Sequence, residues 1–204
     1  SANVLSINIT TGNLMVSESR ILDNVINNPT STACVYVEGG ALHMSNITTH
    51  NGNNQQNFDN PVIQTICNAT ANCILEDLVL EGDCVLLQSQ NSPMGTMLRN
   101  VTIRNSTKGG VYLYVAQSHV DVVNVDIRDT SRRNGAGIQV EIPNGGSVNM
   151  SDIYMSNITS NRSGGCFQSE ITNGSYHLLN TTCQSSRTYT VNVLDGGVGL
   201  VGTF

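Results

Sequence analysis

The sequence predicts an all-β chain that folds as one domain, residues 1–204, into a right-handed parallel β-helix of about seven coils. Two observations carry this prediction. Segments in which apolar and polar residues alternate around a central Asn or Asp occur seven times, and a second kind of alternating segment lies between them. Nowhere do apolar residues keep helical spacing over more than about two turns. Short strands that recur at one period, without helices, are typical of a solenoid.

The Asn- or Asp-centred segments predict a sharp corner in each coil. Asn and Asp tolerate positive φ better than other non-glycine residues. Side chains stacked about 4.8 Å apart can hydrogen-bond to one another as a ladder, which we expect to face inward. We call the central residues pivots: Asn24, Asn46, Asp77, Asn100, Asn124, Asp152 and Asn180.

The segments between the pivot segments predict the first strand of each coil. They span residues 34–40, 62–66, 83–88, 109–115, 135–142, 164–170 and 189–193. In residues 109–115, alternation places Val111, Leu113 and Val115 inside and Tyr112 and Tyr114 outside. Each coil is therefore expected to contain a strand, a turn, a short strand, a pivot and a third short strand.

This arrangement resembles the pectin-lyase-like superfamily of β-helices from about Arg20 to Val193. In that superfamily the second and third strands also meet at a corner that is often Asn. Many of its members are polysaccharide lyases or glycoside hydrolases, but the NTD, GHG and RIK motifs of its polygalacturonases do not occur here. The alternative fold is an antiparallel β-sandwich, which has similar strand spacing but no reason to repeat an Asn corner seven times.

Composition excludes several classes of function. The net charge is −6, and a nucleic-acid-binding stripe is missing because the only clustered arginines are Arg132 and Arg133. No apolar run approaches the roughly 18 residues of a membrane span. The four histidines show no metal-ligand spacing, so we expect surface positions and neither a metal nor a cofactor. They are His43, His50, His119 and His177.

Six cysteines without a CxxC motif indicate disulfides and an oxidising compartment. Cys67 and Cys73 enclose five residues and form the best candidate pair. Cys166 and Cys183 lie on the first and third strands of one repeat, so a bridge between them has to cross the coil. Cys34 and Cys84 are two coils apart, which is too far for a direct bridge unless the coil between them bulges, and they are otherwise either buried thiols or bonded to another chain.

Ten Asn-X-Ser/Thr sequons predict an N-glycosylated protein at a cell or virion surface. Glycans are expected mainly outside the pivots, and the pivots Asn46, Asn100 and Asn180 are expected to be less occupied. Asn68, Asn105, Asn157, Asn161 and Asn173 are predicted to lie in loops. The seven non-pivot sequons are those of Asn8, Asn68, Asn105, Asn149, Asn157, Asn161 and Asn173.

The enzyme hypothesis rests on Glu141 and Glu170, which the strand pattern places outside on adjacent coils. Two carboxylates about 5 Å apart are the arrangement of a retaining glycosidase. No His, Arg or Trp in the pattern lies beside them to tune a pKa or stack on a sugar. A carbohydrate-binding surface would have only Tyr112 and Tyr114 as a platform.

The favoured prediction is a structural protein without enzymatic activity. Both terminal segments alternate or are apolar, and the open ends of a β-helix present unpaired backbone groups. We expect either self-association end to end into a filament or fibre, or a segment of a longer chain.

Overall fold

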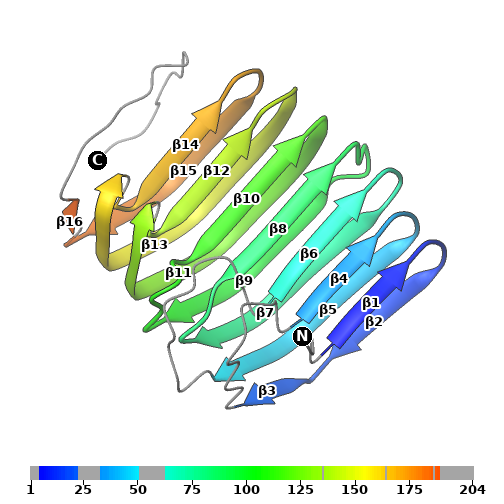
Figure 1. Ribbon diagram of the computed structural model, residues 1–204, viewed down its shortest axis with the longest axis horizontal. Coiled ribbons are helices and arrows are strands. Elements are labelled where there is room, and N and C mark those ends of the chain that lie inside the picture. Colours follow the sequence, from blue (N-terminus) through cyan, green and yellow to red (C-terminus); the bar gives the residue numbers. More distant parts are fainter. Residues whose placement is uncertain are drawn as a thin grey trace.

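The computed structural model describes residues 5–22, 33–50, 63–134, 136–163, 165–185 and 187–188, and it confirms the predicted fold class. All strand pairs are parallel and form two sheets, and the described residues contain no helix. In Figure 1 the strands of each sheet lie side by side in sequence order along the stack. The chain is therefore a parallel β-solenoid rather than an antiparallel sandwich.

The two sheets alternate along the chain. Sheet A contains β1 (Leu5–Ile9), β4 (Ala33–Val37), β6 (Ile63–Asn68), β8 (Val85–Gln90), β10 (Val111–Ala116), β12 (Ile138–Ile142) and β14 (Phe167–Ile171). Sheet B contains β2 (Asn13–Ser17), β5 (Ala41–His50), β7 (Asn72–Glu81), β9 (Thr96–Arg104), β11 (Ser118–Asn134), β13 (Gly146–Ser163) and β15 (Ser175–Gln184). Two short strands extend it, β3 (Arg20–Leu22) beside β5 and β16 (Arg187–Thr188) beside β13.

Five coils, from β6 to β15, run through described residues with gaps of a single residue, rather than the seven predicted. The strand pairs β1/β2 and β4/β5 stack before them, but the segments that link these pairs lie outside the described residues. Strand β1 takes a first-strand position that was not predicted. The predicted strand at 189–193 lies outside the described residues.

Strict alternation of burial explains why these segments are strands. In β6, β8 and β10 every second residue is buried, and Val111, Leu113 and Val115 point inward as predicted. Tyr112 and Tyr114 are partly exposed on the outer face. The core is a continuous aliphatic column between the two sheets, in which Leu75, Leu98 and Val122 occupy one register position on successive coils.

The predicted pivots are confirmed wherever they are described. Asn46, Asp77, Asn100, Asn124, Asp152 and Asn180 have φ between 49° and 57°. The first coil differs, because Glu18 (φ 51°) lies opposite Asn46 and makes the corner there. Asn24, the first pivot predicted from the sequence, lies outside the described residues. A second column of positive φ, which was not predicted, lies five residues after the pivots and includes Asn105, Asp129 and Asn157.

Candidate functional site

The outer face of sheet A brings together the two carboxylates of the enzyme hypothesis. Glu141 on β12 and Glu170 on β14 are register partners on adjacent strands. Each accepts a hydrogen bond from a glutamine of its own strand, Gln139 to Glu141 at 3.0 Å and Gln168 to Glu170 at 3.3 Å. The predicted juxtaposition therefore exists, and both carboxylates are bound to amide donors.

Tyr112 on β10 extends this group by one coil. Burial, and then its hydrogen bond to Glu141, raise the pKa of Tyr112 above its ordinary value. Arg132 is near enough to act on this phenol electrostatically. Arg132 lies within β11, and its charge opposes the rise in the pKa of Tyr112. The face offers two carboxylates, a phenol and amides.

The pivots form a side-chain ladder, but it lies on the exposed surface rather than facing inward as predicted. Asn124 Nδ2 donates to Asn100 Oδ1 at 3.0 Å, and Asn100 Nδ2 donates to Asp77 Oδ1 at 2.9 Å. Further along, Asn180 Nδ2 donates to Asp152 Oδ1 at 2.6 Å. An ionised aspartate accepts but cannot donate, so Asp77 and Asp152 cannot pass the ladder on to the coil before them.

The second positive-φ column makes similar bonds. Asn105 Nδ2 donates to Glu81 Oε1 at 2.8 Å, and Asn157 Nδ2 donates to Asp129 Oδ1 at 2.6 Å. Both asparagines were predicted to lie in loops. Asn105 lies in the bend that follows β9, as predicted, whereas Asn157 lies within β13. Their sequence signal was an Asn or Asp five residues after three successive pivots, Asn100, Asn124 and Asp152.

The exposed sequons lie predominantly on sheet B and its corners. Asn68 ends β6 and is half-buried, and Asn161 lies within β13 rather than in a loop. Asn173 occupies the turn before β15, as predicted. The sequon asparagines with exposed side chains are Asn8, Asn46, Asn100, Asn105, Asn149, Asn157, Asn173 and Asn180. The pivot side chains are exposed, but the Nδ2 atoms of Asn100 and Asn180, to which a glycan would be attached, donate hydrogen bonds in the ladder.

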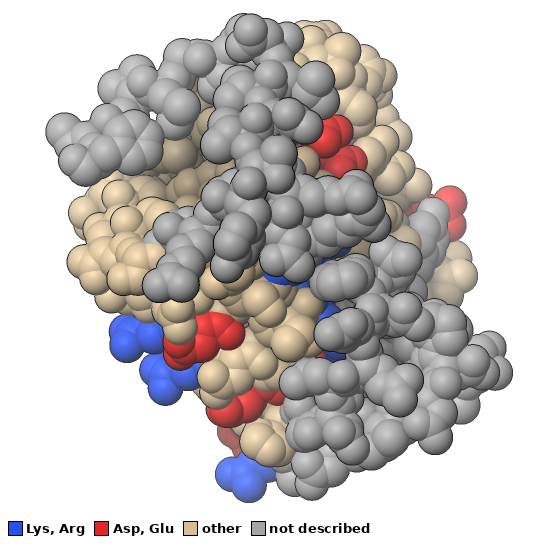
Figure 2. All heavy atoms as spheres, turned by 60° about the vertical axis from the view of Figure 1, so that its left-hand side comes forward, with Lys and Arg blue, Asp and Glu red and all other residues tan. Residues whose placement is uncertain are grey.

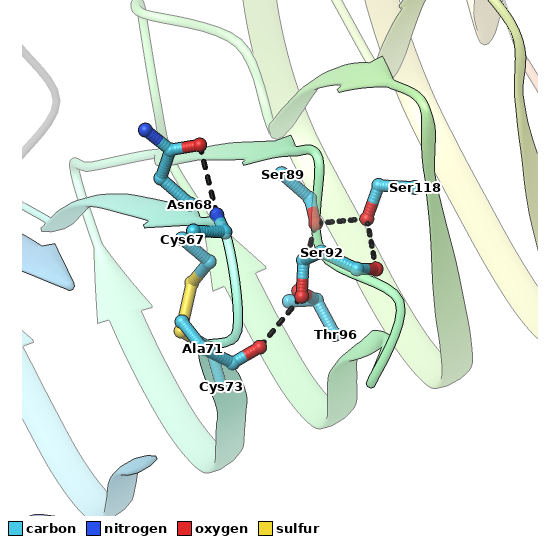
Figure 3. The surroundings of a disulfide bond; sticks show 9 residues. Cys67, Asn68, Ala71, Cys73, Ser89, Ser92, Thr96 and Ser118 are labelled. Carbon is cyan, nitrogen blue, oxygen red and sulfur yellow. Dashed lines mark hydrogen bonds between the residues drawn. A yellow bond between two sulfur atoms is a disulfide. The ribbon is translucent and has the colours of Figure 1, made fainter. Parts of the chain in front are cut away.

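Both predicted disulfides are present. Cys67 and Cys73 join the end of β6 to the start of β7 inside the corner, with a Cα–Cα distance of 6.4 Å (Figure 3). Cys166, immediately before β14, is bonded to Cys183 in β15 with a Cα–Cα distance of 6.3 Å, so the bridge across the coil is sterically possible. Cys84 is a buried free thiol, one of the two predicted alternatives, while the side chain of Cys34 lies outside what the structure describes.

Two polar clusters lie on the outer face of sheet B. Glu76 binds Arg99 and accepts a hydrogen bond from His43 at 2.5 Å, with the imidazole serving as donor. The hydrogen bond from His43 is the main cause that lowers the pKa of Glu76, burial opposes it, and Arg99 adds to it. His119 lies 2.7 Å from Ser147 Oγ and 2.9 Å from Asp121 Oδ1.

Neither cluster has the composition of a metal site, since no group of three His, Cys, Asp or Glu side chains occurs in the described ranges. The described part of the face in Figure 2 carries few charged side chains, and acidic and basic ones are interspersed. No described helix is long and apolar enough to cross a membrane. The two disulfides fit an oxidising compartment.

Comparison with known proteins finds no matching family model, no matching curated protein and no matching solved structure.

Proposed function

We propose that this chain is an extracellular, N-glycosylated structural protein whose rigid β-solenoid associates end to end into a filament or fibre at a cell or virion surface. The observation that carries the proposal is a difference between the middle and the ends of the stack. Inward residues of central strands, such as Leu87 and Leu113, are fully buried. The inward residues Leu14 on β2 and Leu178 on β15 are only partly buried.

The end strands also favour stacking because of their backbones. Within the described residues, β1 and β14 each have one neighbour in sheet A, and β2 and β15 each pair with one main strand of sheet B. Edge strands present free N–H and C=O groups, which another parallel coil would satisfy. When the first coil of one molecule meets the last coil of the next, the contact joins two different surfaces. Such a heterologous contact can repeat into an open filament rather than a closed ring.

Exposed sequons supply the second part of the proposal. Glycans on sheet B and its corners would cover one side of the solenoid and oppose lateral association. Intact-mass measurement before and after enzymatic glycan removal tests this part, and site mapping should find non-pivot sequons such as Asn173 more occupied than the pivots. An unmodified mass of protein from its native source contradicts it.

The filament is tested on the native material by electron microscopy and sedimentation. Seven strands per sheet at about 4.8 Å predict an axial repeat of about 34 Å. Leu14→Lys and Leu178→Lys place a charge on the two ends and should shorten or abolish filaments. Val79→Lys, at an outer position that is 47% exposed, is the matched control and should leave them intact. A sedimentation coefficient of a monomer at every concentration contradicts the proposal.

The alternative function is a polysaccharide-active enzyme or a carbohydrate-binding adhesin module, favoured by the Glu141–Glu170 pair, Tyr112 and the resemblance to pectin-lyase-like β-helices. The test compares Glu141→Gln and Glu170→Gln with Gln88→Glu on the same outer face. Cleavage of a polysaccharide by a monomer, lost in the first two variants and kept in the third, would replace the structural proposal.

A further inference from the structure

The only lysine of the chain is buried against an aspartate. Lys108 lies in the bend between β9 and β10, and Asp83 lies in the equivalent segment one coil earlier, between β7 and β8. Their exposed fractions are 8% and 0%, and Lys108 Nζ lies 3.0 Å from Asp83 Oδ1. The pair therefore connects two successive coils away from water.

The fold itself does not require a charged pair at this corner. Strands β8, β10, β12 and β14 are in register, and the residues that correspond to Asp83 in the later coils are Gly109, Ala136 and Gly165. Small residues thus fill the same corner elsewhere. Burying an ammonium and a carboxylate has a desolvation cost that their attraction often fails to recover.

Arginine would be the better choice for a lasting buried ion pair, because its planar guanidinium binds a carboxylate through two hydrogen bonds. The chain contains eight arginines and one lysine, and it is the lysine that is hydrogen-bonded to Asp83. A lysine amine differs in that, once it has lost its proton, it is a nucleophile. The corner is strongly desolvated, since burial raises the pKa of the neighbouring Cys84 thiol to about 12.

The backbone holds both partners in place. The N–H of Lys108 donates to Ser106 Oγ at 3.1 Å, and the N–H of Gly82 donates to the carbonyl of Arg104 at 2.8 Å. Val85 N–H donates to the carbonyl of Gly110 at 3.0 Å, beyond the pair. Fixed contact of this kind raises the effective concentration of two reacting groups by many orders of magnitude.

We propose that Lys108 and Asp83 condense into an intramolecular amide bond that covalently joins two successive coils. The ammonium of Lys108 first transfers a proton across the hydrogen bond to the Asp83 carboxylate, which leaves a neutral amine and a carboxylic acid. Nζ then attacks Cγ, the bond from Cγ to the hydroxyl oxygen breaks, and that hydroxyl leaves with a proton from Nζ as water. No oxidant, reductant or further reactant takes part.

Mass spectrometry of the folded, full-length chain after glycan removal tests the proposal. The expected mass is about 18 Da below that of the disulfide-bonded sequence, since one water leaves. After reduction and trypsin digestion, the peptide that contains Asp83 should remain joined to the peptide that begins at Asn105, with Lys108 uncleaved. The full mass together with trypsin cleavage after Lys108 overturns the proposal.

Lys108→Arg is the matched control, because it keeps the positive charge but its guanidinium does not form this amide. Its mass should equal the calculated value, and its two peptides should separate. A loss of about 18 Da that persists in this variant would place the lost water elsewhere and would also overturn the assignment. The wild-type mass alone decides the proposal even where the variant fails to fold.

Discussion

Two corners of each coil obey different rules. At the pivot column, all seven described positions have positive φ, and six of them are Asn or Asp. At the inner corner between the two sheets, one register position holds the disulfide Cys67–Cys73, then Ser89 with Thr96, then Val115 with Val120 on successive coils. Figure 3 shows the first two of these pairs.

The difference separates two kinds of constraint. A backbone constraint restricts the residue type, since few side chains accept positive φ without strain. The inner corner requires only that the side chains fill the available volume and that their buried polar atoms form hydrogen bonds. Ser89 meets it by bonding to Thr96 at 2.9 Å and to Ser118 at 2.6 Å, and Ser118 in turn donates to the carbonyl of Ser92 at 3.0 Å.

The largest effect is expected from a substitution that the inner corner cannot satisfy. Val120→Asp places a carboxylate at a position that is 0% exposed, and it should cost several kcal/mol or prevent folding. Val79→Asp, on the outer face of sheet B, should cost less than about 1 kcal/mol. Thermal unfolding followed by circular dichroism compares the two, and equal losses would mean that the inner corner is not specially constrained.

Replacing the cysteine pair at the inner corner by the residue pairs found there on later coils tests what the corner requires. It should accept any pair that fills the volume and leaves no polar atom without a hydrogen bond. Cys67→Val with Cys73→Val copies the valine pair and should lose only the cross-link, about 2 kcal/mol for so short a loop. Cys67→Ser with Cys73→Thr copies the next coil and should lose more, because the surrounding hydroxyl network is missing there. Urea unfolding of both double variants gives the ranking, and the reverse order would refute volume as the rule.

Removing half of the hydroxyl pair should cost more than removing all of it. Ser89→Ala leaves Thr96 and Ser118 without their shared partner and should destabilise by about 1 to 3 kcal/mol. The double variant Ser89→Ala with Thr96→Val removes two polar groups together and should recover part of this loss. A double variant that is less stable than the sum of its single variants would contradict this explanation.

Beside the pivot column, Glu76 predicts a small dependence of stability on pH. Its folded-state pKa is lowered, chiefly by the hydrogen bond from His43, so its stabilising contribution is present above the unfolded pKa of about 4.3. That contribution is lost as pH falls through the folded pKa. Glu76→Gln should reduce the difference in stability between pH 7 and pH 3 by less than about 1 kcal/mol. Urea titrations at both pH values measure it, and an unchanged difference would contradict the prediction.

The smallest effect is expected from completing the pivot ladder. Asp152→Asn supplies the missing donor opposite Asn124 and keeps the acceptor for Asn180, so it should stabilise by about 0.5 kcal/mol. The reverse change, Asn124→Asp, removes the donation to Asn100 and should destabilise by a similar amount. Chemical denaturation resolves both, and the same sign for the two variants would show that charge rather than the ladder dominates.

Sequence patterns predicted what depends on local periodicity. The alternation of apolar and polar residues predicted which side chains point inward. The preference of Asn and Asp for positive φ predicted the six pivots that the structure describes. The pivot predicted at Asn24 lies outside the described residues. The corner at Glu18 was not predicted, because glutamate seldom adopts this conformation and so leaves no signal. The pairing of Glu141 with Glu170 followed from counting alternate residues in two strands of similar register.

Contacts that depend on side-chain reach across coils could not be predicted. The approach of Lys108 to Asp83 starts from a bend, where no periodicity fixes the direction of a side chain. The effect of Arg132 on Tyr112 joins two different strands, β11 and β10, and alternation within one strand does not show which long side chains meet. The second positive-φ column could have been found, because Asn105, Asp129 and Asn157 follow their pivots by the same five residues. It was missed because these residues resembled ordinary loop asparagines.

The side-chain ladders give the solenoid a direction. In every ladder bond described above, the amide belongs to the later coil and the accepting oxygen to the earlier one. The stack therefore has a direction, with the hydrogen-bond acceptors of the ladders facing one end and the donors facing the other. Two molecules that met with like ends would set acceptor against acceptor or donor against donor. Any fibre of this chain should accordingly be polar, with two growing tips that differ in chemistry and in rate.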